Sequence, residues 1–242
     1  MFSTMSMAAQ EPNGKTSSLP DGFVFLTDVD PTIIEDVRYF GSENFMGKPV
    51  PGYTVNRIIC SEKAALALKG VHEVLKKHGF LLVVYDGYRP QRSVDSFLEW
   101  AEDDDLTGKA NYYPTLTKHE IFEQGFISPH SEHTRGSTFD LSIIPVGTSV
   151  KPVAVTERVL KNGEKIPFLD DNTVDMGSSF DLFHPVSHNN NSLITAKEQE
   201  NRALLRKSMS DGGFKGYSEE WWHYRLVNEP FPDTYFDFVA SL

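Results

Sequence analysis

The sequence is nearly free of cysteine, because Cys60 is the only one in 242 residues. An intramolecular disulfide is therefore excluded, and a buried hydrophobic core must hold the fold together. We expect Cys60 to be a small buried residue of that core. The sequence also lacks an apolar run long enough to cross a bilayer, so it predicts no transmembrane span.

Basic residues are in the minority, with 23 lysines and arginines against 34 aspartates and glutamates and a formal net charge of −11. The long-range field of such a chain would repel nucleic acid and anionic membrane surfaces, so neither is an expected partner. A small zwitterionic ligand is compatible with this charge. The sequence contains no internal repeat or heptad pattern, and it does not indicate an oligomeric state.

The N-terminal stretch, residues 1–20, lacks both the basic region and the apolar region of a secretion signal. It is rich in Met, Ser, Ala, Gly and Pro, and we interpret it as a disordered tail. Residues 21–242 are long enough to bury a substantial core, and we predict that they form one domain. The chain is expected in the cytoplasm, or in the periplasm if a native signal peptide is missing from it.

Hydrophobic periodicity places helices and strands along the chain. Apolar residues recur at helical spacing from Ala64 to Leu75, after a potential N-cap at Ser61 and before a stop at Gly79. The other expected elements are a short strand at 23–26, an extended piece at 36–40, a buried strand at 80–85, a helix opened by Pro90, a short helix near 117–124, a strand at 138–144, a hairpin or long excursion within 145–178, and a helix after Thr195 with capping-box spacing to Glu198.

One stretch, residues 131–140, combines two potential metal ligands. His133 and Asp140 are seven residues apart, and Gly136 between them lets the backbone turn, so both side chains can reach one cation. In the strand at 138–144, apolar residues alternate with Asp140 and Ser142. This alternation places the Asp140 carboxylate on the face opposite to the core, where a site can lie.

A second stretch near the C-terminus contains Glu220 and His223. With His133 and Asp140, His223 would give zinc three protein ligands and leave the fourth tetrahedral position to water, while Glu220 would carry protons. Residues three apart point to opposite faces of a regular strand, so we predict a turn or bulge between 220 and 223. Glu219 is the alternative carboxylate at this position.

These two motifs carry a resemblance. Ser-x-His-x-x-Gly-x-x-x-Asp at 131–140 and Glu-x-x-His at 220–223 resemble the signature of zinc D-alanyl-D-alanine dipeptidases, the VanX-type members of the Hedgehog/DD-peptidase superfamily. The resemblance covers roughly residues 23–239. It implies an α+β fold, a single domain in which helices flank a central, mostly antiparallel sheet, with one catalytic zinc. Four further stretches resemble this branch in the same order, at 44–57, 86–90, 180–188 and 235–238.

The resemblance also implies roles for individual residues. The spacing Glu-x-x-His selects Glu220 over Glu219 as the general base. Arg89 follows the buried strand at 80–85, which would hold its guanidinium rigidly at the rim of the sheet. There it can stabilise the negative charge that forms on the oxygen of the scissile carbonyl.

Ser131, Asp181 and Tyr53 match residues that hold the substrate in this family. We expect Asp181 and Ser131 around the ammonium end of a small D,D-dipeptide, although Asp181 also fits a plain turn residue. A dipeptidase must recognise a free amino terminus and a carboxylate close together, so a carboxylate on one side and donors on the other would set the substrate length.

The expected function is hydrolysis of D-Ala-D-Ala to two D-alanines by a zinc metallopeptidase. This reaction would belong to peptidoglycan and cell-wall metabolism. A rival enzyme of the same superfamily is a D,D-carboxypeptidase or endopeptidase that acts on peptidoglycan peptides. A rival of another class is a zinc-stabilised binding module without catalysis. Glu220 and Arg89 argue against the latter, since a structural zinc needs neither a base nor an oxyanion partner.

Overall fold

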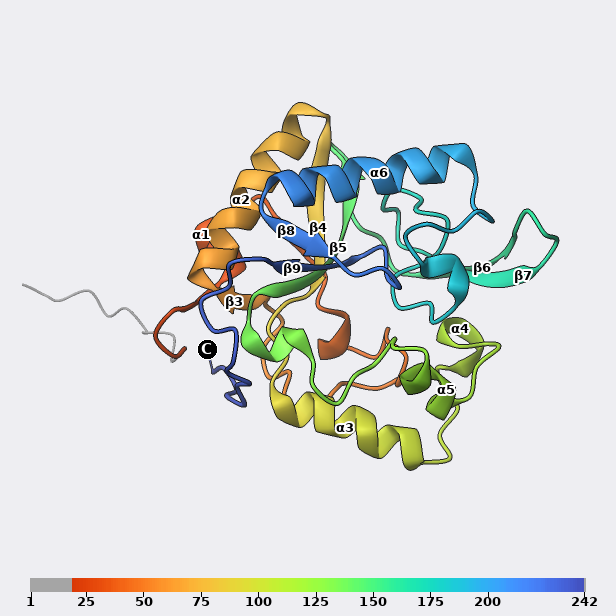
Figure 1. Ribbon diagram of the computed structural model, residues 1–242, viewed down its shortest axis with the longest axis horizontal. Coiled ribbons are helices and arrows are strands. Elements are labelled where there is room, and N and C mark those ends of the chain that lie inside the picture. The colour runs from red at the N-terminus through yellow and green to blue at the C-terminus, as the bar shows by residue number, and fades with distance from the viewer. Residues whose placement is uncertain (1–18, 242) are drawn as a thin grey trace, which may run out of the picture.

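The chain is built around a five-stranded sheet, described here by a computed structural model that covers residues 19–241 (Figure 1). The strand order is β2-β4-β5-β9-β8, and only the β2 and β4 pair is parallel. The expected mostly antiparallel sheet is confirmed. Its strands are β2 (Ile34–Glu35), β4 (Phe80–Asp86), β5 (Thr138–Pro145), β8 (Phe214–Gly216) and β9 (His223–Leu226).

Helices lie on both sides of this sheet. In Figure 1, α2 and α6 run along one side, and α3, α4 and α5 lie on the other. Within residues 19–241, every helix is too short or too polar to cross a bilayer. The helices are α1 (Leu26–Val29), α2 (Glu62–Lys77), α3 (Gln91–Glu102), α4 (Lys109–Tyr112), α5 (Lys118–Glu123) and α6 (Ala196–Asp211), with the 3₁₀ helices η1 (Arg38–Phe40), η2 (Glu132–Arg135) and η3 (Pro185–Ser187).

The two longest helices begin where the sequence predicts. The Ser61 side chain accepts a hydrogen bond from the Ala64 amide and caps α2, and Gly79 follows its end with a φ of +83°. Thr195 and Glu198 form a capping box at the start of α6. Both helices pack against the sheet face that presents Phe139, Leu141 and Ile143 of β5, which are fully buried.

The opposite face of the sheet meets a second, aromatic cluster. It contains residues of the 39–50 segment, α3, α4 and α5, among them Tyr39, Phe45, Phe97 and Trp100. Because successive residues of a strand point to opposite faces, Asp140 is directed away from the α2 and α6 core and toward this second side. The site described below lies there.

Two smaller sheets complete the fold. One pairs β1 (Phe23–Phe25) with β3 (Ile59–Ser61), and the other is a hairpin of β6 (Ala154–Val159) and β7 (Lys165–Asp170). The hairpin projects from the body of the molecule (Figure 1) and confirms the excursion expected within 145–178.

Two stretches differ from the expected structure or lie outside its described part. The segment 36–40 is not extended throughout, because η1 begins at Arg38, whose side chain turns back to Asp36 with Nε at 2.7 Å from its carboxylate. This local ion pair favours a turn over a strand. Residues 1–18 of the predicted N-terminal tail lie outside the described residues.

Candidate active site

Three neighbouring strands place charged side chains in one row. Asp140 in β5 pairs directly with Asp86 in β4 on one side and with His223 in β9 on the other. Directly opposed residues of a sheet point to the same face, so these three side chains are neighbours. The row therefore brings together residues that are up to 137 positions apart in the chain, from 86 to 223.

His133 reaches this row from the 3₁₀ helix η2, which directly precedes β5. The Ser131 hydroxyl accepts a hydrogen bond from the His133 amide and caps η2. Gly136 ends it with a φ of +76°, and a Cβ there would lie 2.2 Å from the Phe23 ring. Glycine is therefore required at 136 both by the backbone conformation and by the contact with Phe23.

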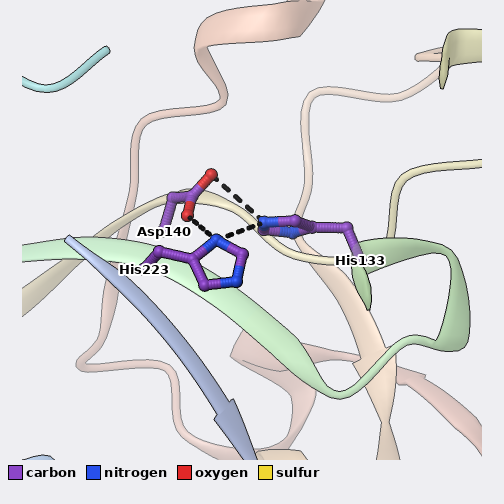
Figure 2. Close-up of side chains that lie close together, drawn as sticks. All are labelled: His133, Asp140 and His223. Carbon is purple, nitrogen blue, oxygen red and sulfur yellow. Dashed lines mark hydrogen bonds and ion pairs between the residues drawn. The ribbon is translucent and has the colours of Figure 1, made fainter. Parts of the chain in front are cut away.

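Figure 2 shows His133, Asp140 and His223 converging on one point. One potential ligand atom of each residue lies within 4.8 Å of the other two. His133 Nε2 is 3.3 Å from His223 Nδ1 and 3.3 Å from Asp140 Oδ2, and His223 Nδ1 is 3.1 Å from Asp140 Oδ1. The structure thus brings together the three residues that the sequence predicts as metal ligands.

The protonation pattern of these atoms fits a metal ion. His133 Nδ1 lies 2.8 Å from the carbonyl oxygen of Gly87, which can only accept, so Nδ1 carries the proton and Nε2 presents its lone pair. Asp140 Oδ1 is buried without a hydrogen-bond partner. Two nitrogens and a carboxylate whose lone pairs face one another suit a cation held by nitrogen and oxygen ligands.

The pKa values of the site residues also indicate that a positive charge is favoured there. Burial opposes protonation of His223, but its contacts with the Asp140 and Glu132 carboxylates raise its pKa to about 10. Burial opposes ionisation of Asp140, but the adjacent histidines His133 and His223 lower its pKa. A proton on His223 therefore takes the place that a metal cation would fill.

Glu220 lies three residues before the start of β9, and the chain bends between them at residues 221–222. The bend puts the Glu220 carboxylate 3.5 Å from His223 Nδ1, so the turn predicted between 220 and 223 is present. Glu220 is buried, and burial raises its pKa well above the usual range, with further increases from Asp140 and Asp181. The neighbouring Glu219 instead faces His188, 3.3 Å away.

A cavity of about 250 Å³ opens over the three predicted metal ligands. Arg89 is part of its wall, and its guanidinium is held by two hydrogen bonds to Asp86 Oδ2, of 2.8 and 3.0 Å. The same guanidinium lies 3.5 Å from Asp140 Oδ2. Burial opposes its charge, but Asp86 and the nearby tyrosines hold the pKa of Arg89 above its usual value. Arg89 is thus a fixed positive charge beside the predicted metal ligands.

Asp181 and Ser131 also line this cavity. Asp181 has a φ of +58°, and its buried carboxylate accepts a hydrogen bond of 2.8 Å from the Tyr39 hydroxyl. Burial and the charge of Asp140 raise the pKa of Asp181 to about 8. A buried carboxylate of this kind suits a cationic group, because a positive partner would restore its ionised form.

The structure does not bring Tyr53 to the cavity. Its hydroxyl donates a hydrogen bond of 2.6 Å to Asp86 Oδ1, and its ring is not part of the cavity wall. The expected contact of Tyr53 with the substrate stays a prediction. Tyr53 lies behind Asp86, where it supports the carboxylate that holds Arg89.

Sequence reasoning missed three residues of the site. Tyr39 lines the cavity, Asp86 anchors Arg89, and Glu132 also lines the cavity, 3.8 Å from His223 Nε2. Asp86 had a visible signal, since it ends a buried strand. Tyr39 had none, because its partner Asp181 is 142 positions away.

Comparisons with known proteins show which family the chain resembles. The family model Peptidase_M15, described as D-ala-D-ala dipeptidase, matches residues 20–151 and 168–241. A D-alanyl-D-alanine dipeptidase of Enterococcus faecalis is 40% identical over 92% of this chain and 100% of its own length. One of Streptomyces coelicolor is 38% identical over 90% of this chain and 98% of its own length.

A more distant D-alanyl-D-alanine dipeptidase, from Escherichia coli, is 28% identical over 84% of this chain and 83% of its own length. Among solved structures, the LdcB LD-carboxypeptidase, described in connection with peptidoglycan recognition, superposes with a TM-score of 0.39 at 17% identity. That superposition covers 87% of this chain and 70% of the other.

Proposed function

Because the chain belongs to the Peptidase_M15 family of D-ala-D-ala dipeptidases, we propose that it hydrolyses D-Ala-D-Ala to two D-alanines with one zinc ion. His133, Asp140 and His223 would hold the zinc. The observation that carries the proposal is the set of three converging ligand atoms with a buried carboxylate, Glu220, beside them.

The chemistry divides between the metal and the protein. When bound, zinc polarises the scissile carbonyl and lowers the pKa of a water molecule. Glu220 accepts the proton of the attacking water, since its carboxylate lies 3.5 Å from His223 Nδ1 and therefore beside the place where the zinc would be held. It then passes this proton to the nitrogen of the departing D-alanine.

Arg89 has the complementary role. Its guanidinium, held by Asp86, donates to the carbonyl oxygen as that oxygen gains negative charge. The buried pair keeps the donor in place before the reaction, so little reorganisation is needed at the moment of bond breaking. This role for Arg89 also separates an enzyme from a protein with a purely structural zinc.

The cavity supports a short substrate. At about 250 Å³ it is smaller than the pockets of drug-sized ligands, which occupy roughly 300–1,000 Å³. Asp181, with Ser131 nearby on the wall, would receive the free ammonium group. An acyl group on that nitrogen would remove its charge and leave the Asp181 carboxylate without a cationic partner.

A hydrolysis assay tests this function. D-Ala-D-Ala should be cleaved, whereas L-Ala-L-Ala, N-acetyl-D-Ala-D-Ala and a pentapeptide ending in D-Ala-D-Ala should be poor substrates. Equal kcat/KM for the free and the N-acetylated dipeptide would show that the ammonium group is not recognised. Preferred cleavage of the pentapeptide would instead favour the carboxypeptidase alternative.

A further inference from the structure

Glu132 is a charged residue of the cavity wall that the proposed reaction does not use. It lies in η2 directly before His133, and its side chain is 41% exposed. Two arginines hold its carboxylate: Arg225 Nε is 3.0 Å from Oε1, and Arg135 Nη2 is 3.3 Å from the same oxygen. Both contacts are to Oε1, so the second oxygen, Oε2, remains for another partner.

The two arginines are themselves fixed. Arg135 forms a bidentate pair with Glu229, with distances of 3.0 and 2.9 Å, and Arg225 Nη1 lies 3.3 Å from the same carboxylate. The Glu229 side chain is buried, with 3% exposed. Glu132 is thus one end of a four-residue network that is anchored in the interior, and its carboxylate has a defined direction.

That direction is toward the outer nitrogen of His223. Glu132 Oε2 is 3.8 Å from His223 Nε2, whereas the other ring nitrogen, Nδ1, faces Asp140, His133 and Glu220. A neutral imidazole presents a lone pair at one nitrogen only if the other carries the proton. A charged N–H···O contact is ~2.8 Å long, so a movement of about 1 Å would close a hydrogen bond.

We propose that Glu132 is a positioning residue that fixes the His223 ring with its proton on Nε2, so that Nδ1 is free to bind the metal. The inference rests on the proposed role of His223 as a metal ligand. A carboxylate behind a metal-bound histidine orients the ring and increases its basicity. His133 has a different partner, the backbone carbonyl of Gly87, which no side-chain substitution removes.

Zinc affinity tests the proposal. The dissociation constant of zinc is measured by competition with a chelator for the wild type, Glu132→Ala and Glu132→Gln, with Glu219→Gln as the matched control. Loss of the hydrogen-bond partner behind a metal ligand weakens metal binding by about 10- to 100-fold. Glu132→Ala should therefore weaken zinc binding by this factor. Glu132→Gln should weaken it by less, because its amide oxygen still accepts a hydrogen bond. The control should bind zinc as the wild type does.

A second readout is independent of affinity. In the zinc-loaded wild type, the histidine ring NMR spectrum should show a protected Nε2–H for His223, and this signal should be lost in Glu132→Ala. An unchanged dissociation constant in both Glu132 variants, or an unchanged ring signal, would overturn the proposal. A higher KM with unchanged zinc affinity would show that Glu132 faces the substrate instead. A wild type that binds no zinc would contradict the proposed function itself.

Discussion

Two buried clusters of the same composition lie at the end of β4, and only one of them belongs to the site. In the first cluster, the Asp86 carboxylate accepts hydrogen bonds from Arg89, at 2.8 Å, and from the Tyr53 hydroxyl, at 2.6 Å. In the second, the Asp171 carboxylate accepts from an arginine at 2.7 Å and from the Tyr85 hydroxyl at 2.6 Å. Tyr85 and Asp86 are successive residues of β4.

The second cluster has a structural role. Its arginine is Arg38, which also pairs with Asp36, and Asp171 follows directly after the end of β7. The other oxygen of Asp171 accepts from the amide and the hydroxyl of Thr173. Every acceptor of this carboxylate is thus used within the protein, and the cluster ties the base of the β6 and β7 hairpin to the sheet.

The first cluster differs in its surroundings. Arg89 forms part of the cavity wall and lies 3.5 Å from Asp140, which has a buried oxygen without a hydrogen-bond partner. A buried Arg–Asp–Tyr arrangement alone therefore does not indicate an active site. The difference is the presence of acceptors that the protein leaves unpaired beside an accessible cavity.

Metal removal should distinguish the two clusters most strongly. Chelation, or the substitution His223→Ala, should abolish hydrolysis of D-Ala-D-Ala, because one of three protein ligands or the ion itself is lost. The Asp171 cluster contains none of the three predicted ligands and should be unaffected. Activity and metal content measured together check this, and full activity in metal-free protein would contradict the mechanism.

The next largest effect concerns the base. Glu220→Gln should retain zinc and the fold but lower kcat by roughly 10²–10⁴, the usual contribution of general acid–base catalysis. Glu219→Gln is the matched control and should behave as the wild type, since Glu219 faces His188 outside the row of ligands. A loss of zinc in Glu220→Gln would make this residue a ligand, and the reaction would lack its base.

The two arginines give a direct comparison. Arg89→Met and Arg38→Met each leave a buried carboxylate without its cation, and each should lower the free energy of unfolding by about 3–5 kcal/mol. Only Arg89→Met should also lower kcat, by about 10²–10³, because it removes the donor to the carbonyl oxygen. Chemical denaturation and kinetics at a temperature where both variants are folded separate the two effects. An equal loss of kcat in Arg38→Met would remove the distinction between the clusters.

Local signals in the sequence were sufficient for much of the fold and for three side chains that the structure brings together, His133, Asp140 and His223. The caps at Ser61 and Thr195 and the alternation in 138–144 are short-range patterns, and the structure has α2, α6 and β5 at these places. The bend before His223 also followed from local geometry, because Glu220 could not share a face with it in a regular strand.

Such short-range patterns could not predict contacts between side chains that are far apart in the sequence. Nothing near Arg38 indicates that its side chain meets Asp171, 133 positions later. Tyr53 was assigned to the substrate because its stretch resembles the family. In the structure its hydroxyl donates to Asp86, and its ring packs edge-on against Tyr39, which lines the cavity.

The smallest expected effect tests the role of Tyr53. Tyr53→Phe and Tyr85→Phe each remove one donor from a buried carboxylate, which should cost about 1–3 kcal/mol of stability. Neither should raise the KM for D-Ala-D-Ala, because Tyr53 is not part of the cavity wall. Tyr53→Phe should lower kcat by about 10-fold or less, since Asp86 would hold Arg89 with less constraint, whereas Tyr85→Phe should leave kcat unchanged. A raised KM in Tyr53→Phe alone would support the assignment of Tyr53 as a residue that contacts the substrate.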